Sequence, residues 1–202
     1  MSTNRWDVFY NEDLRVTSAP HTLCAEYAAE KFKHHGCAAI LDLGCGLGRD
    51  SIYLASAGFR VTALEYSLTG LIKAKNRVFP ARPLDISLLQ ADSTVLPFPE
   101  DCFDGIYCFG LLHEFLPPDA DQLVASTLNE VSRVLKNGGQ LVLTVLAGEP
   151  LAGLPYVRLF TEEMVDFSEY DLECREKTKY SDIGCTGSTD YVVWRCLYQK
   201  AK

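Results

Sequence analysis

A glycine-rich loop directly after a short apolar run is the feature that most constrains the fold of this chain. Residues 38–43 (AAILDL) are typical of a buried strand, and residues 44–48 (GCGLG) follow them. A short helix is expected next, over residues 49–57. Glycines at such a junction let the backbone turn tightly and approach a ligand closely. In open parallel α/β sheets, ligands bind beyond the carboxyl ends of the strands. The loop therefore indicates a nucleotide-like ligand in an α/β fold.

The spacing of the glycines argues against a nicotinamide dinucleotide. The loop has the pattern G-x-G-x-G, whereas the dinucleotide fingerprint is G-x-G-x-x-G. Arg49 occupies the position of the third glycine in that fingerprint. Asp42 stands two residues before the first glycine, where a carboxylate suits an ammonium group better than a pyrophosphate. An NAD-dependent oxidoreductase is therefore disfavoured.

Two further acids follow the next two expected strands. Glu65 comes directly after residues 59–64 (FRVTAL), and Asp92 closely follows residues 86–90 (ISLLQ). Glu65 could accept hydrogen bonds from both hydroxyls of a ribose, or it could be an ordinary acid at a strand end. Asp92 could accept one from the amine of adenine, or it could stabilise a turn. Three acids at successive strand ends, beside a glycine loop, are more specific than any one of them.

Strand-like and helix-like segments alternate along the middle of the chain, which favours βαβ units and a parallel sheet. We expect one domain over residues 1–202, with a capping segment at 1–36, cofactor-binding units at 37–146 and a C-terminal part at 147–202. A long helix should follow residues 117–119 and end at residues 137–139 (NGG). Further expected elements are strands at 103–109 and 140–146, helices at 22–33 and 161–165, and two antiparallel strands at 170–180 and 190–199 joined by a loop at 184–190.

Composition limits the classes of partner. The 202 residues are 48% apolar and 23% charged, which excludes a disordered chain. The net charge of −8 weighs against unaided nucleic-acid binding, which depends on phosphate neutralisation. No apolar run is long enough to span a membrane, and no signal peptide is evident, so we expect a cytoplasmic protein. The eight cysteines include no C-x₂-C pair, so we expect buried thiols and no metal site, with a thiolate site as the alternative.

Four segments together resemble the class I S-adenosylmethionine-dependent methyltransferase family. They are ILDLGCGLGRDS, VTALEYS, LLQADSTVLPFPEDCFDGIYCFGLLHEF and VSRVLKNGGQLVLTVL, and they cover residues 39–146 approximately. Within that family the chain looks similar to the small tellurite-resistance-type enzymes. Those enzymes carry a histidine and arginines between their last two strands, whereas residues 180–190 (YSDIGCTGSTD) contain neither. The resemblance implies a Rossmann-like α/β fold with a seven-stranded sheet in the order 3-2-1-4-5-7-6, strand 7 antiparallel, and helices on both faces.

The resemblance also implies how the cofactor is held. Asp42 and the glycine loop would hold the methionine part of S-adenosylmethionine, Glu65 the ribose hydroxyls, and Asp92 with the backbone of Ser93 the adenine. The cofactor-binding residues implied in this way are Asp42, Gly44, Cys45, Gly46, Gly48, Glu65, Tyr66, Asp92, Ser93, Phe109 and Gly110.

Two residues are candidates for the chemistry itself. His113 follows the fourth strand and could act as a general base, or it could be a packing residue. Tyr10, together with Trp6, could close over the cofactor, or it could pack in the N-terminal segment. We expect methyl transfer to a small molecule through an oxygen, nitrogen, sulfur or metalloid nucleophile, with S-adenosylhomocysteine as the product. The alternatives are a protein or RNA methyltransferase that works with a partner subunit, and a cofactor-binding module without catalysis.

Overall fold

The computed structural model describes residues 5–12, 20–78, 84–148, 158–184 and 187–201, and it contains a seven-stranded sheet. The strand order is β3-β2-β1-β4-β5-β7-β6, as predicted, and β7 runs antiparallel to both of its neighbours. The strands are β1 (Ala39–Leu43), β2 (Arg60–Glu65), β3 (Ile86–Gln90), β4 (Phe103–Phe109), β5 (Leu135–Leu146), β6 (Tyr170–Gly184) and β7 (Gly187–Lys200). The α-helices are α1 (Arg5–Glu12), α2 (Leu23–His34), α3 (Arg49–Ser56), α4 (Leu68–Val78) and α5 (Ala120–Val134).

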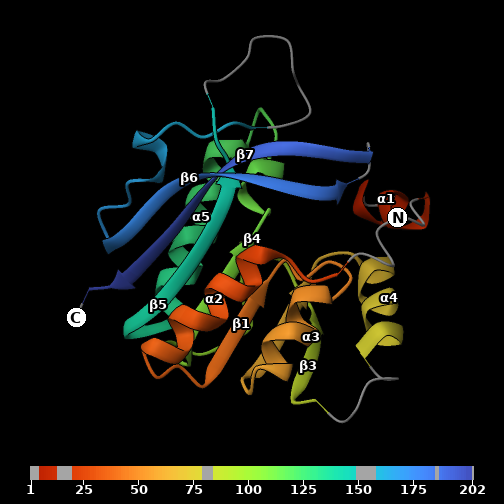
Figure 1. The fold of residues 1–202 in the computed structure, drawn as a ribbon, viewed down its shortest axis with the longest axis horizontal. Helices are drawn as coiled ribbons and strands as arrows, with labels where there is room; N and C mark the ends of the chain where they lie inside the picture. The colour runs from red at the N-terminus through yellow and green to blue at the C-terminus, as the bar shows by residue number, and fades with distance from the viewer. Residues whose placement is uncertain (1–4, 13–19, 79–83, 149–157, 185–186, 202) are drawn as a thin grey trace.

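Helices cover both faces of the sheet (Figure 1). All five residues of β1 are buried, and its apolar residues are divided between two apolar clusters. Leu41 and Leu43 belong to the cluster that includes the apolar side of α5, whereas Ile40 belongs to the cluster formed with α2 and α3. Because successive side chains of a strand point to opposite faces, a continuous apolar run requires cover on both sides. This confirms the predicted helix arrangement.

The register of the parallel strands brings the predicted acids to one edge. Leu43 pairs with Leu64 across β1 and β2, and Glu65 pairs with Gln90 across β2 and β3. The carboxyl ends of these strands are therefore level. The segments that follow them, which carry the glycine loop and Asp92, leave the sheet on the same side. This alignment positions the candidate site.

The long helix ends earlier than expected. Helix α5 stops at Val134, and β5 begins at Leu135, so residues 137–139 lie within the strand and do not end the helix. The strand begins there because Leu135 pairs with Phe103, and a register shift separates this pair from the next one, Gly105 with Gln140. The glycines that resembled a helix stop therefore accommodate an irregularity in the sheet.

Two expectations for the C-terminal part were also wrong in extent. The helix expected at 161–165 is a single 3₁₀ turn, Glu163–Val165. The loop expected at 184–190 is shorter, because β6 continues to Gly184 and β7 begins at Gly187, with these two residues paired. The N-terminal aromatic segment, for which no secondary structure was predicted, is helix α1.

The cysteines in the described part of the chain are free thiols, and each of them is buried or half-buried. Burial raises the pKa of the Cys108 thiol to about 12, so this group is a neutral packing residue at physiological pH. Cys185 lies outside the described residues. Among the described residues, no helix has the length and apolar character needed to cross a membrane.

Candidate functional site

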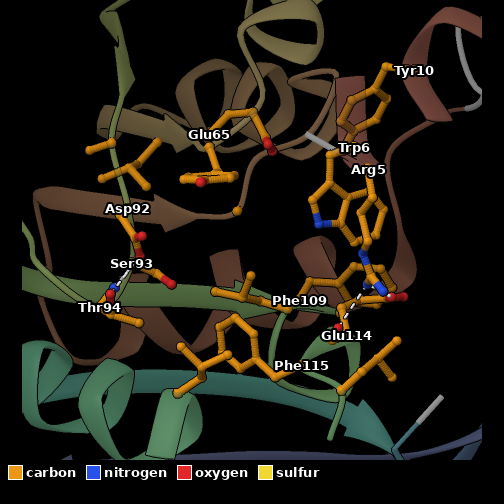
Figure 2. A pocket seen from close by; sticks show the side chains of 18 residues that line it. Arg5, Trp6, Tyr10, Glu65, Asp92, Ser93, Thr94, Phe109, Glu114 and Phe115 are labelled. Carbon is orange, nitrogen blue, oxygen red and sulfur yellow. Dashed lines mark hydrogen bonds and ion pairs between the residues drawn. The ribbon is translucent and has the colours of Figure 1, made fainter. Parts of the chain in front are cut away.

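A cavity of about 390 Å³ lies at the carboxyl edge of the sheet. Its wall is formed by helix α1, the loop after β1, the ends of β2, β3 and β4, and the start of α5. Figure 2 shows acids from separate strand ends around it. The predicted site residues on its wall are Tyr10, Gly44, Glu65, Tyr66, Asp92, Ser93, Phe109 and Gly110. The predicted residues that the structure does not place on the wall are Asp42, Cys45, Gly46, Gly48 and His113.

Glu65 joins the end of β2 to the glycine loop. Its side chain is buried, and Oε2 accepts a hydrogen bond from the Gly46 N–H at 2.9 Å. Oε1 accepts a second one from the Ser67 N–H at 2.8 Å. Burial raises the pKa of Glu65, although these backbone donors oppose the effect. The carboxylate is thus fixed by two N–H groups while it still faces the cavity.

The glycine loop needs its glycines because the backbone is left-handed. Gly44, Gly46 and Gly48 have φ angles of 81°, 54° and 73°, which side chains disfavour. A Cβ atom on Gly46 would also come within 3.0 Å of the Tyr10 hydroxyl. The N–H groups of Gly44 and Cys45 both donate to the Leu64 carbonyl at 2.9 Å, which anchors the loop to β2.

Asp42 lies behind the loop, where it is only 2% exposed. The Ser51 hydroxyl donates to its Oδ2 at 2.5 Å, which ties β1 to the first turn of α3. Burial raises the pKa of Asp42 to about 7, with smaller contributions from Asp50 and Glu65. The acid therefore supports the loop from below and does not form the cavity wall.

Asp50 forms a buried polar network that the sequence did not suggest. Its carboxylate accepts hydrogen bonds from the Thr22 N–H at 2.8 Å, the Thr22 hydroxyl at 3.0 Å and the Tyr107 hydroxyl at 2.9 Å. Thr22 also caps helix α2, because its Oγ1 accepts from the Ala25 N–H at 3.0 Å. Three segments distant in sequence are thereby joined behind the glycine loop.

Asp92 shows the turn contacts that its alternative interpretation required. Its Oδ1 accepts from the Thr94 N–H at 2.9 Å and from the Thr94 hydroxyl at 2.7 Å. Ser93 is buried, and its hydroxyl lies 3.3 Å from that of Thr127 in α5. Asp92 is exposed and lines the cavity, so the turn holds its carboxylate at the cavity edge (Figure 2).

Helix α1 contributes Arg5, Trp6 and Tyr10 to the cavity wall (Figure 2). The helix is tied to the start of α4 by Asp7, whose Oδ1 accepts from the Ser67 hydroxyl at 2.5 Å and from the Thr69 N–H at 3.1 Å. Tyr10 and Trp6 therefore lie where a cover over a ligand would lie.

His113 is not among the residues that line the cavity, although its Nε2 lies 3.7 Å from Oε1 of Glu114. Its Nδ1 accepts from the Leu146 N–H at 3.3 Å, and its side chain is only 13% exposed. Burial lowers the pKa of His113 to about 4. The geometry favours the packing interpretation over the general base. The next residue, Glu114, does line the cavity, and its Oε2 lies 2.9 Å from Nη2 of Arg5.

A profile of the methyltransferase-domain family matches residues 41–143, which is more than half of the chain. The chain is also similar to a demethylmenaquinone methyltransferase of Renibacterium salmoninarum, with 35% identity over 127 residues. That match covers 62% of this chain and 48% of the relative. The chain thus spans about half the length of the curated relatives it matches.

Solved structures show the same fold at low sequence identity. TehB from Haemophilus influenzae has a TM-score of 0.70 and 19% identity, covering 87% of this chain and 62% of its own. The 1,6-didemethyltoxoflavin-N1-methyltransferase of Burkholderia thailandensis, with bound 1,6-didemethyltoxoflavin and S-adenosylhomocysteine, has a TM-score of 0.66 and 19% identity. It covers 90% of this chain and 80% of its own. At these identities the likeness concerns the fold.

Proposed function

Because the chain belongs to the methyltransferase-domain family, as a class I S-adenosylmethionine-dependent enzyme, we propose that it methylates a small molecule in this cavity. The observation that carries the proposal is the shared wall formed by Gly44, Glu65 and Asp92. These residues lie at or just after the ends of three neighbouring strands. They offer one ligand a glycine backbone that it can approach closely and two carboxylates. Carboxylate acceptors of this kind suit an adenosyl ligand with hydroxyl and amine donors and a positively charged sulfonium.

The residues present fit S-adenosylmethionine part by part. Glu65 would accept hydrogen bonds from the two ribose hydroxyls, since its orientation is already fixed by Gly46 and Ser67. Asp92 would accept from the exocyclic amine of adenine, and the backbone of Ser93 would contact the ring. The methionine part would lie against the glycine loop. We assign Asp42 a supporting role beneath that loop, since Ser51 holds it there.

When bound, S-adenosylmethionine supplies a methyl group already activated by the sulfonium. The chain therefore has to position the acceptor, exclude water and favour the cation. Trp6, Tyr10 and Phe109 present aromatic rings to the cavity, and aromatic faces attract cations. Helix α1 covers the cavity and would keep the transfer dry.

Two observations support a small acceptor. The cavity is partly covered by α1, and the chain carries a net charge of −8, which disfavours an RNA substrate. The relative from Renibacterium salmoninarum is named for a demethylmenaquinone, and the Burkholderia thailandensis enzyme holds 1,6-didemethyltoxoflavin. Both names describe small acceptors of those proteins, and we extend that class to this chain.

The test is calorimetric titration with S-adenosylmethionine, S-adenosylhomocysteine and NAD. We expect the two adenosyl ligands to bind and NAD not to bind. Glu65→Gln should weaken their binding by about 1–3 kcal/mol, because an amide nitrogen would replace an acceptor oxygen. Glu26→Gln, which makes the same change at an exposed position on α2, is the matched control. Absence of adenosyl binding would refute the proposed function. Unchanged affinity in Glu65→Gln would refute only the ribose assignment.

A further inference from the structure

The cavity contains an ion pair that the cofactor assignment does not use. Arg5 Nη2 donates to the Glu114 carboxylate at 2.9 Å and to the Glu114 carbonyl at 2.8 Å. Figure 2 shows this pair on the other side of the cavity from Asp92. Of the described lining residues, the acids are Glu65, Asp92 and Glu114. With the first two assigned to ribose and adenine, Glu114 is the acid that remains for the acceptor.

The surroundings of Glu114 are mainly apolar and aromatic. Trp6, Phe115 and Leu116 line the cavity together with it, and its own side chain is only 27% exposed. The charged and titratable groups beside it are the Arg5 guanidinium and the His113 ring, whose Nε2 lies 3.7 Å from Glu114 Oε1. Burial raises the pKa of Glu114, although the Arg5 guanidinium opposes the effect. Burying such a carboxylate costs free energy, which the Arg5 ion pair offsets in part, and acids with a perturbed pKa in a cavity are candidates for a functional role.

The 3₁₀ turn after β4, Leu112–Glu114, explains why Glu114, and not His113, lines the cavity. Leu112 is fully buried in the core, and His113 turns toward the Leu146 N–H. Because successive side chains of a tight turn point in different directions, Glu114 is the one presented to the cavity.

We propose that Glu114 is the catalytic base of the transfer, that Arg5 positions it, and that the acceptor is a planar aromatic hydroxyl. This inference rests on the proposed function. The hydroxyl oxygen forms a bond to the methyl carbon, while the carbon–sulfur bond breaks and its electron pair stays on sulfur. The hydroxyl proton passes to the Glu114 carboxylate and then to water.

The proposed class of acceptor follows from asking which nucleophiles need a general base before they can attack a methyl group. A neutral amine attacks through its lone pair, and a thiol ionises readily by itself, whereas a hydroxyl keeps its proton near neutral pH. A carboxylate whose pKa is raised by burial accepts that proton better than an exposed one. The rings of Trp6 and Phe115, which also line the cavity, suit a flat acceptor.

Arg5 couples the orientation of Glu114 to the position of helix α1. The helix is held to α4 through Asp7, and it brings Arg5 and Trp6 to the cavity together. The Arg5 side chain is 46% exposed, and its guanidinium lies 4.7 Å from the Trp6 ring centroid. The base is therefore oriented by the same helix that covers the ligand.

The experiment uses two acceptors of one shape, 2-naphthol and 2-naphthalenethiol, with release of S-adenosylhomocysteine as the readout. For Glu114→Gln we expect cofactor affinity within about twofold of wild type, and a kcat for 2-naphthol lower by about 100-fold or more. The thiol, which is the stronger acid, should lose far less. Glu26→Gln is the matched control that should change neither rate.

Arg5 is tested through the pH profile of kcat/KM. Arg5→Gln removes the cation that lowers the pKa of Glu114, so the acidic limb should move to higher pH, and Arg5→Lys should restore it. The proposal is overturned if wild-type protein that binds S-adenosylmethionine leaves 2-naphthol unmethylated. It is also overturned if Glu114→Gln retains the rate or loses it equally on the thiol. A wild-type protein that binds no S-adenosylmethionine refutes the proposed function instead.

Discussion

The free energy of unfolding of the Asp42→Asn variant, relative to that of wild type, should increase as the pH rises from 5 to 8. Burial raises the pKa of this carboxyl from 3.8 to about 7 in the folded protein. A group with a raised folded-state pKa favours folding fully below its unfolded pKa, and that contribution is lost as pH rises through the folded value. At about 1.36 kcal/mol per pH unit, the loss reaches about 4 kcal/mol above pH 7. Between pH 5 and pH 8 it grows by about 3 kcal/mol.

The measurement is urea unfolding of wild type and Asp42→Asn at several values of pH between 5 and 8. The free energy of unfolding of each protein is compared at each pH, with the slope m checked for constancy. The asparagine amide imposes its own packing and hydrogen-bonding costs beside Ser51, but these do not vary with pH. The free energy of unfolding of the variant minus that of wild type should therefore increase as the pH rises. A difference that stays flat would refute the assignment of a buried, neutralised acid.

Asp104→Asn is the control with the opposite sign. Burial raises the pKa of Asp104, but hydrogen bonds from Lys136, Ala39 and Ala38 outweigh it and hold the pKa below its usual value. Such a group stabilises the fold above its unfolded pKa of 3.8, and the contribution is lost as pH falls through the folded value. The variant should therefore be less stable than wild type by an amount that stays constant from pH 5 to 8.

Three further substitutions test the packing of helix α1 on α4 and the buried network around Asp50. Gly70→Ala would place a Cβ 2.8 Å from the Tyr10 ring, so helix α1 should become more susceptible to limited proteolysis. Tyr107→Phe removes a hydroxyl that donates to buried Asp50 and should cost about 1–3 kcal/mol, measured by urea unfolding. Thr22→Ala removes a helix cap as well as a donor to Asp50, so its loss in the same assay should be at least as large.

The glycine loop and the acids at the strand ends could be located from sequence because their signals are local. A continuous apolar run such as β1 needs cover on both faces, and glycines after it need a left-handed turn. These requirements follow from a few adjacent residues, and together they limited the topology to a parallel sheet with ligand sites at one edge. The antiparallel end, by contrast, came from the resemblance and from alternation in two segments.

The features of the site that could not be predicted from the sequence depend on side-chain orientation or on contacts between residues distant in sequence. His113 and Glu114 are neighbours in sequence, and either residue type can act as a general base. Only the direction of the 3₁₀ turn decides that Glu114 lines the cavity. The network around Asp50 joins residues that are 28 and 57 positions apart. Helix α1 was not predicted because its aromatic side chains line the cavity and contact one another, and they are not part of an apolar core stripe.

The same acids explain why the site suits a cation. Asp50 and Glu65 add to the effect of burial in raising the pKa of Asp42, so the negative charge of these two acids lies behind and beside the glycine loop. The chain offsets part of it with Arg49, whose Nε lies 4.0 Å from Asp50 Oδ1. A ligand with a sulfonium and an ammonium group would offset more. On the proposed function, cofactor binding and fold stability are therefore linked, and adenosyl ligands that bind only the folded protein should raise its apparent stability.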